Sequence, residues 1–438
     1  MSSPHSGDRR DFLKASAAVA GVAASVNFAG AFAAGNDTIK VGLIGCGGRG
    51  TGAVHNLLEA ESIISQAPKV EIVAVGDAFK DRAEGAVKAF KTGKDYAPYA
   101  AQVKVTPETT FDGLDAYQKV LAAGVDLVIL ATPPGFRPIH LEAAIKAKKN
   151  IFCEKPVAVD ATGARKCFEL AEESKKQNLA IVAGTQRRHQ KGYIETIQKL
   201  DDGAIGEILA ARCAWNGTGI WFNKRQKGQK DSTYQLRNWY HYLWLCGDHI
   251  VEQHVHNLDV INWIMKDHPV KAIGMGGRAN RPSGPASEAG QIWDHFAVEF
   301  EYKNGVKLYS YCRHIPGDTD ISETAVGSKG TCHMSNNTYH IGRTEVGKDD
   351  RNAYVQEHID LLNSIRAGRP INELKQVTES TFTAILGRNA SYSCKNLKWS
   401  DALAAAEDTM PKNLALDTDL PASPAPVAGF WKLPAKAV

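Results

Sequence analysis

A glycine-rich turn near the start of the chain constrains the fold more than any other feature. It follows a β-branched run at residues 39–44, precedes a helical pattern at 51–60, and reads Gly45-Cys46-Gly47-Gly48-Arg49-Gly50. In such a strand–turn–helix unit the first glycine permits the tight turn, the second lets the backbone approach a pyrophosphate, and the third lets the helix pack on the strand. The turn therefore predicts a dinucleotide-binding Rossmann domain; a glycine turn without a ligand is the alternative.

A carboxylate at the end of the second predicted strand supports this interpretation. Asp77 closes residues 70–77, where a carboxylate accepts hydrogen bonds from a ribose diol and repels a 2′-phosphate. We therefore expect NAD rather than NADP. The interval from Gly50 to Asp77 is longer than the usual ~20 residues, which we attribute to an insertion near residues 59–69.

Apolar runs that alternate with helical patterns indicate how the first part of the chain folds. Runs at residues 70–75, 125–131 and 151–153 are separated by helical stretches. This alternation is typical of a buried parallel sheet with helices on both faces. We expect an α/β Rossmann domain at residues 34–156.

The chain after this domain has a different pattern. We expect an α+β domain at residues 157–410 with a large, mostly antiparallel sheet. Its clearest element is a β-hairpin of residues 293–302 and 306–314 around an Asn304-Gly305 turn. Residues 411–438 are rich in Pro and Ala, which predicts an extended C-terminal tail.

The first 33 residues predict an export signal rather than part of the fold. Arg9-Arg10 opens a charged region, an uncharged run rich in Ala, Val and Gly follows, and Ala31-Phe32-Ala33 matches a small-residue cleavage site. The paired arginines resemble a twin-arginine signal, which implies a periplasmic or other extracytoplasmic location and no stable membrane insertion after cleavage. A disordered or membrane-anchoring N-terminus is the alternative.

Composition narrows the range of partners. The 438 residues carry a net charge of +4, with 43% hydrophobic and 23% charged residues and no basic patch with interleaved aromatics, so we expect no nucleic-acid partner. The eight cysteines have neither CxxC nor CxxH spacing. We therefore expect no metal site, no disulfide framework and mostly buried thiols.

Two further segments end predicted strands, where a parallel sheet presents its ligands: Ala131-Thr132-Pro133-Pro134 and Glu154-Lys155-Pro156. Together with the glycine turn and Asp77, this order of motifs resembles the Gfo/Idh/MocA family of glucose-fructose oxidoreductases and inositol dehydrogenases. The resemblance implies that Lys155 lies near the nicotinamide and bonds the reacting hydroxyl, with Glu154 and Pro156 fixing its backbone. A lysine in a cleft can share an alcohol's proton as hydride leaves, whereas an isolated lysine is usually solvated.

Residues 247–259 are expected to form a helix that continues past Asp259. On it Glu252, His256 and Asp259 follow i, i+4, i+7, so that His256 can take the hydroxyl proton while an acidic neighbour holds its tautomer. The family's helix typically carries Asp, Gly and His where this chain has Glu252, His254 and His256; His256 matches and the other two depart. A metal site is an alternative, but the HEXXH spacing is absent, and His254 can equally be structural.

Five of the eight tryptophans fall between residues 215 and 263, mostly in a long irregular stretch at 216–247. Buried core is the default interpretation of tryptophan, but in a loop that also carries polar side chains these rings can stack on a sugar. A cluster at 185–189, which ends a predicted strand, is expected to contribute as well. The expected substrate contacts are Arg188, His189, Trp221, Arg237, Tyr240 and Asp259.

These features predict an NAD-dependent oxidoreductase that transfers hydride between a sugar or polyol secondary alcohol and a tightly bound nicotinamide, with Lys155, His256 and Glu252 as catalytic residues. Free NAD is not expected outside the cytoplasm, so an exported enzyme would recycle its cofactor in place. One alternative is an NAD-dependent glycoside hydrolase that works by oxidation, elimination, addition and reduction, as the family's α-N-acetylgalactosaminidases do. Another is a non-catalytic NAD- and sugar-binding protein. An exposed face of the second sheet is expected to form homo-oligomers, as is common in relatives.

Overall fold

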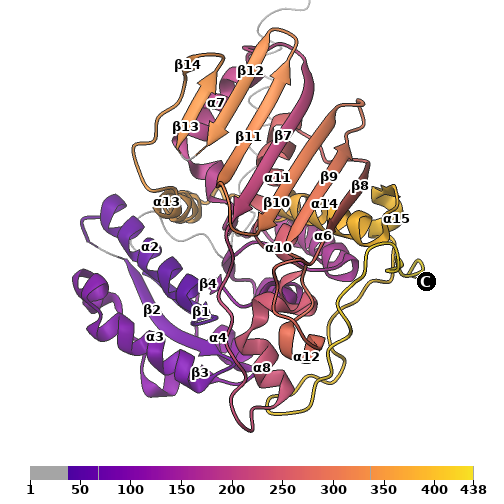
Figure 1. The fold of residues 1–438 in the computed structure, drawn as a ribbon. Helices are drawn as coiled ribbons and strands as arrows, with labels where there is room; N and C mark the ends of the chain where they lie inside the picture. Colours follow the sequence, from indigo (N-terminus) through magenta and orange to yellow (C-terminus); the bar gives the residue numbers. More distant parts are fainter. Residues whose placement is uncertain (1–37, 68, 336, 438) are drawn as a thin grey trace, which may run out of the picture.

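The computed structural model describes residues 38–67, 69–335 and 337–437, and its first part is built on a parallel sheet (Figure 1). The six strands run in the order β3-β2-β1-β4-β5-β6, and every neighbouring pair is parallel. They are β1 (Ile39–Ile44), β2 (Val70–Asp77), β3 (Thr110–Asp112), β4 (Leu127–Leu130), β5 (Asn150–Cys153) and β6 (Ile181–Ala183). Strand β4 is buried at every residue, which explains its continuous apolar run, because a parallel sheet is covered on both faces.

The helices around this sheet follow the strands in a regular alternation. They are α2 (Gly48–Ile64), α3 (Lys80–Thr92), α4 (Ala116–Ala122), α5 (Arg137–Lys146) and α6 (Ala161–Lys176). Helix α2 runs to Ile64, so most of the long interval before Asp77 is a lengthened first helix. Its Glu61 side chain is fully buried and forms an ion pair with Arg366 at 2.8 Å.

The second part is a nine-stranded sheet in the order β14-β13-β12-β11-β7-β10-β9-β8-β15. Its strands are β7 (Ile208–Gly217), β8 (Lys271–Gly277), β9 (His295–Glu301), β10 (Lys307–His314), β11 (Asp320–Gly327), β12 (Gly330–Ser335), β13 (Thr338–Ile341), β14 (Thr344–Glu345) and β15 (Leu397–Lys398). Strands β7 and β10 pair parallel, and the other pairs are antiparallel. The predicted fold class is confirmed, and so is the hairpin of β9 and β10, whose turn contains Gly305 at φ 86°.

Some helices of the second part lie against one face of this sheet, and others lie against the first part of the chain (Figure 1). They are α7 (Lys191–Asp201), α8 (Asp231–Arg237), α9 (Leu243–Cys246), α10 (His249–Glu252), α11 (Val255–Met265), α12 (Ala286–Ala289), α13 (Ala353–Arg366), α14 (Leu374–Ser393) and α15 (Trp399–Leu403). Helix α13 packs against α2 and joins the hydrophobic core of the parallel sheet. Strand β6 extends that sheet past residue 156, so the expected boundary at 156 falls between β5 and α6 of one continuous unit.

The C-terminal tail lies along the surface as an extended segment (Figure 1). Leu414, Leu416 and Leu420 pack on the small apolar cluster around Trp244. The Trp293 indole N–H donates to the carbonyl of Pro426 at 2.8 Å. The tail is therefore held against the body of its own chain. The predicted signal at residues 1–33 lies outside the described residues.

Candidate active site

A cavity of about 770 Å³ opens at the carboxyl ends of the parallel strands. Its first wall is formed by the loops after β1, β2, β4 and β5, the position at which open parallel sheets bind ligands. Residues of the second part close the opposite side: Trp215, Trp221, Asn223, Leu236, Arg237, Trp239, Glu252, Gln253, His256 and Tyr354. The cavity therefore joins a nucleotide-type sheet edge to an aromatic and polar wall.

The glycine turn has the geometry that a pyrophosphate requires. Gly45 has φ 99°, and a Cβ there would lie 2.5 Å from the backbone carbon of Ala131. A Cβ at Gly50, the third glycine of the turn, would lie 1.9 Å from the Gly45 oxygen, so this glycine allows the helix to pack closely on the strand. Gly50 does not line the cavity. A Cβ at Gly47 or Gly48 would have no protein atom within 4 Å. The start of α2 carries no side-chain cap, so its backbone N–H groups are available for phosphate oxygens.

Asp77 is held rigidly at the end of β2. Its Oδ2 accepts the backbone N–H of Cys46 at 2.8 Å, and its Oδ1 accepts that of Phe79 at 3.0 Å. Burial raises the pKa of this carboxyl group. Each oxygen retains a further lone pair, which suits the diol of an adenosine ribose. Arg82 lines the same end of the cavity.

Thr132 and Pro133, which were expected to bind the cofactor, line the cavity after β4. The buried Arg137 guanidinium donates to the carbonyls of Leu130 and Thr132, each at 2.7 Å. The Thr132 hydroxyl lies 3.1 Å from Nδ1 of His140. These contacts fix the loop whose backbone faces the cofactor side of the cavity.

Arg49 and Glu154 also line the cavity, and they bond to each other. The Arg49 guanidinium lies over the Tyr354 ring at 5.0 Å and 3.6 Å from the fully buried Glu357. Burial and then the charge of Glu154 raise the pKa of Glu357 well above its usual range. Arg49 thus links the glycine turn to the strand end before Lys155.

Lys155 faces Glu252 across the cavity. Its Nζ donates to the Glu252 carbonyl at 2.6 Å and to Oε1 at 3.0 Å. Both side chains are 12% exposed. An ammonium group has three N–H donors, so the Lys155–Glu252 pair leaves one donor for an oxygen of a bound molecule.

The predicted continuous helix over residues 247–259 is wrong, because the chain forms two helices, α10 and α11, that break at Gln253 and His254. The His254 Nε2 bonds to the Ser310 hydroxyl of β10 at 2.7 Å in a fully buried site. This tertiary contact overrides the helical pattern. The i, i+4, i+7 face consequently does not exist: Glu252 and His256 line the cavity, and Asp259 does not.

His256 lies in the cavity wall and stacks on Trp215, with ring centroids 5.9 Å apart. Burial, and then the charge of Lys155, holds the pKa of this imidazole well below its usual range. Among the described residues no group hydrogen-bonds to its ring, and its Nδ1 is buried. The charge of Lys155 therefore disfavours a second positive charge on the neighbouring His256 ring.

Several expected substrate contacts belong to a polar layer behind the cavity. Arg188 pairs with Asp259 at 2.8 Å, and Asp259 also accepts the Ser380 hydroxyl at 2.7 Å. His189 pairs with Asp360 at 2.7 Å and with Glu373 at 3.2 Å. The structure does not place these residues on the cavity surface.

Three other expected contacts are placed differently. Trp221 and Arg237 line the cavity, with Arg237 paired to Asp81 at 2.7 Å. Tyr240 is buried just behind the wall and donates to Oε1 of Gln253 at 3.2 Å.

Sequence reasoning missed Gln253, Asn223 and Tyr354. Gln253 sits at the helix break, which no local pattern signals. Tyr354 arrives on α13, far along the chain, through the packing of that helix on α2. Asn223 lies in the aromatic loop that was predicted to be functional, and there the loop itself was the signal.

Two comparisons of sequence identify the family. The model described as "Oxidoreductase family, NAD-binding Rossmann fold" matches residues 39–182, and that of the GFO/IDH/MocA C-terminal domain matches residues 193–333. An inositol 2-dehydrogenase of Klebsiella pneumoniae (strain 342) is 26% identical over 304 residues, which cover 68% of this chain and 74% of that protein. The chain belongs to the Gfo/Idh/MocA family of NAD-binding oxidoreductases, as its motifs predicted.

Solved structures show the same fold. An oxidoreductase from Thermotoga maritima superposes with a TM-score of 0.61 at 20% identity, covering 83% of this chain and 99% of that one. A levoglucosan dehydrogenase, solved with NADH and levoglucosan, gives a TM-score of 0.65 at 14% identity, covering 83% and 99%.

Two features are absent from the part of the chain that the structure describes. Within residues 38–437, apart from 68 and 336, no helix combines the length and apolar character needed to cross a bilayer. The same residues contain no group of three or more His, Cys, Asp or Glu side chains placed to hold a metal ion. Seven of the eight cysteines are buried thiols, and Cys394 is exposed.

Proposed function

We propose that this protein is an NAD-dependent oxidoreductase that acts on a secondary alcohol of a polyol or sugar. The observation that carries the proposal is the Lys155–Glu252 pair beside His256, in one cavity with an uncapped glycine-turn helix. The Klebsiella pneumoniae relative is an inositol 2-dehydrogenase, and one structural neighbour is a levoglucosan dehydrogenase. Both names support a polyhydroxylated substrate.

The residues present fit NAD. The open space at Gly47 and Gly48 and the free amides of α2 would hold the pyrophosphate, and the Asp77 carboxylate would accept the ribose hydroxyls. Asp77 also favours NAD over NADP, since it repels a 2′-phosphate. When bound, the nicotinamide supplies the hydride acceptor.

The remaining chemistry falls to side chains. Lys155 donates its third N–H to the reacting hydroxyl and favours negative charge on that oxygen, while Glu252 orients the ammonium. His256 accepts the hydroxyl proton as the carbonyl forms. Trp215, Trp221 and Trp239 exclude water from the wall of the cavity and offer faces on which a sugar ring can stack.

The test uses the purified mature protein without added cofactor. Any nucleotide released on denaturation is identified, and the near-ultraviolet absorbance of reduced nicotinamide is followed with inositols, sugars and glycosides. Reduction by a polyol supports the proposal. Release of an aglycone without net reduction would instead favour the redox-neutral glycoside hydrolase. The absence of bound nucleotide together with no affinity for added NAD would refute both.

We further propose export of the mature enzyme by the twin-arginine route, supported by Arg9-Arg10 and the Ala31-Phe32-Ala33 site. An exported enzyme needs a retained cofactor that one substrate reduces and another reoxidises. Replacing both arginines by lysine is expected to leave the protein in the cytoplasmic fraction. Export that persists in this variant would contradict the route.

The open face of the nine-stranded sheet is the surface that we propose for self-association. On it Ile273, Met275, Tyr309 and Tyr311 are exposed, with Met275 at 70%. Strands β8 and β10 flank β9. Ile273 and Tyr309 both pair with Glu299, and Met275 and Tyr311 both pair with Ala297, so the four side chains lie on one face of the sheet. Met275→Asp is expected to lower the mass measured by light scattering; a wild-type monomer would contradict the proposal.

A further inference from the structure

Gln253 is a polar side chain of the cavity wall that the proposed chemistry does not use. Gln253 lies in the break between α10 and α11, directly after Glu252, and lines the cavity. Its amide has an acceptor end and a donor end, which bind opposite kinds of group. The end of the amide that faces a substrate therefore determines whether the site binds a hydrogen-bond donor or an acceptor of that substrate.

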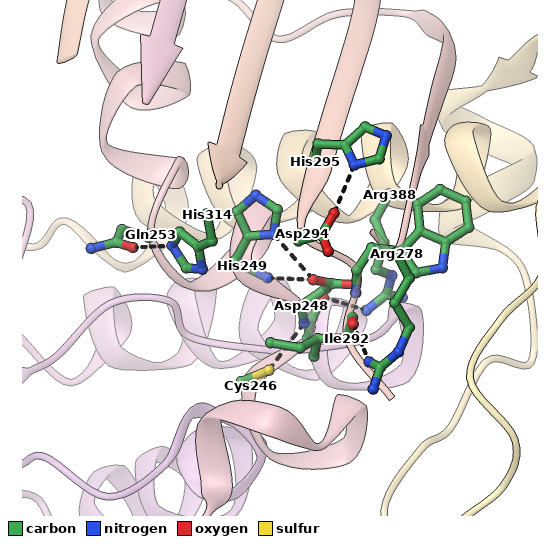
Figure 2. A network of polar contacts seen from close by, with 12 residues as sticks. Cys246, Asp248, His249, Gln253, Arg278, Ile292, Asp294, His295, His314 and Arg388 are labelled. Atoms are coloured by element: carbon green, nitrogen blue, oxygen red, sulfur yellow. Dashed lines mark hydrogen bonds and ion pairs between the residues drawn. The ribbon is translucent and has the colours of Figure 1, made fainter. Parts of the chain in front are cut away.

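The acceptor end of Gln253 is turned away from the cavity by two partners. Oε1 lies 2.8 Å from Nε2 of His314, at the end of β10, and accepts the Tyr240 hydroxyl at 3.2 Å. Figure 2 shows the amide oxygen directed at His314 and the amide nitrogen on the far side. Among the described residues no group accepts a hydrogen bond from that nitrogen.

Arg281 excludes the flipped amide. Its Nη2 lies 2.9 Å from Nδ1 of His314, and a guanidinium can only donate. Nδ1 is therefore the acceptor of the His314 ring, and Nε2 carries the proton. A flipped Gln253 would direct its NH₂ group at this N–H, placing two donors face to face.

The surroundings keep His314 in this neutral tautomer. Its side chain is buried against the ring of His249, with ring centroids 4.5 Å apart and the planes tilted by 33°. Burial, followed by the neighbouring His249 and Arg281, lowers the pKa of His314 far below its usual range. His249 in turn lies beside the buried Asp248 carboxylate (Figure 2). The chain Arg281–His314–Gln253 is thus polarised in one direction, from the cation toward the cavity.

We propose that Gln253 is a specificity-determining residue that presents its amide N–H donors to an oxygen on a carbon near the reacting one. The inference rests on the proposed polyol oxidoreductase function and adds one element to it. The oxygen bound must accept, as a hydroxyl, carbonyl or carboxylate oxygen does. His314 and Arg281 are positioning residues, because they act through the orientation of Gln253.

The test pairs a variant with a deoxy substrate. Gln253→Met keeps the length of the side chain and removes both donors. The probes are inositols and their single-deoxy analogues, with kcat/KM measured by nicotinamide reduction and binding to the NAD-loaded protein followed by tryptophan fluorescence. For wild type, one deoxy position other than the reacting one is expected to cost ~10-fold in kcat/KM. For Gln253→Met, kcat/KM on the parent inositol should be ~10-fold lower than for wild type. On that deoxy analogue, kcat/KM of the variant should equal that of wild type, because the hydrogen bond is already missing.

Three further variants separate this role from general damage. Gln198→Met, an exposed substitution on α7, is the matched control and should behave as wild type. Gln253→Glu keeps the acceptor toward His314 without the donors and should lose the same discrimination as Gln253→Met. His314→Leu frees the amide to turn and should reduce discrimination against the deoxy analogue while NAD affinity stays unchanged.

The outcomes distinguish this inference from the proposed function. Two results would refute only the role of Gln253. One is that wild type oxidises inositols and Gln253→Met has the same kcat/KM. The other is that the loss of kcat/KM from the variant and the loss from the deoxy analogue multiply when the two are combined. If wild type neither binds nor oxidises any polyol, the proposed function fails first, and the inference fails with it.

Discussion

Replacement of Lys155 by Met tests the centre of the proposed site. The Lys155 Nζ donates to the Glu252 carbonyl at 2.6 Å and to its carboxylate at 3.0 Å. Of its three donors, one is left for the reacting oxygen. Met preserves the length and apolar stem of the side chain and removes the charge and every donor.

The expected loss follows from what that donor does. A positioned proton-sharing group contributes ~10²–10⁴-fold to rate, which corresponds to about 3–5 kcal/mol of transition-state stabilisation. We expect kcat to fall within this range and NAD affinity to change little. Met also leaves the 12% exposed Glu252 carboxylate without its cation, so the free energy of unfolding should fall by ~1–3 kcal/mol.

A double variant separates these two effects. Lys155→Met with Glu252→Gln removes the unpaired charge, so stability in urea should recover while kcat stays low. The assay is the single-turnover rate of nicotinamide reduction by a polyol that wild type oxidises. A Lys155→Met enzyme within ~3-fold of wild type at every pH would refute the catalytic role. Recovery of activity in the double variant would show that Lys155 only neutralises Glu252.

Three other changes give sharp expectations. Asp77→Ala removes the ribose acceptor and should weaken NAD ~10-fold relative to NADP in titration calorimetry; an unchanged ratio of the two affinities would contradict the assignment. Because burial and then the charge of Lys155 lower the pKa of His256, kcat/KM should show no loss from protonation of that ring between about pH 8 and about pH 6. A fall in kcat/KM below about pH 6.5 that disappears in His256→Phe would argue against a lowered pKa of His256. Arg187→Met leaves the fully buried Glu323, now paired at 2.6 Å, without its cation, and should cost ~3–5 kcal/mol in urea unfolding; an unchanged midpoint would refute that estimate.

The features that the sequence predicted are those fixed by local geometry. The glycine turn, Asp77 and Lys155 each end a strand of a parallel sheet, so knowing the strand gives the position of the side chain. His256 was predicted through the family motif, and it does line the cavity. These residues needed no knowledge of how the two parts of the chain pack.

The features that the sequence did not predict depend on contacts between distant segments. The break between α10 and α11 arises where His254 bonds to Ser310 on β10, and it decides that Glu252 and not Asp259 faces Lys155. Arg188 does not end a strand as expected: β6 ends at Ala183, Arg188 lies in a short 3-10 helix at Gln186–His189, and its guanidinium pairs with Asp259 behind the cavity. The sequence shows which residues follow a predicted strand. It does not show where a long charged side chain points, because that depends on the opposite charge that packing brings beside it.

The low basicity of His256 bears on the direction of the reaction. Lys155 and Glu252 together carry no net charge, so a proton taken up by His256 adds one positive charge to a buried site that also contains Arg187 and Arg49 nearby. An imidazole whose protonated form is this disfavoured is a weak base, but once protonated it is a strong acid. Lys155 therefore has to stabilise the developing negative charge on the oxygen before His256 takes the proton during oxidation, and a protonated His256 returns it readily to a ketone oxygen during reduction.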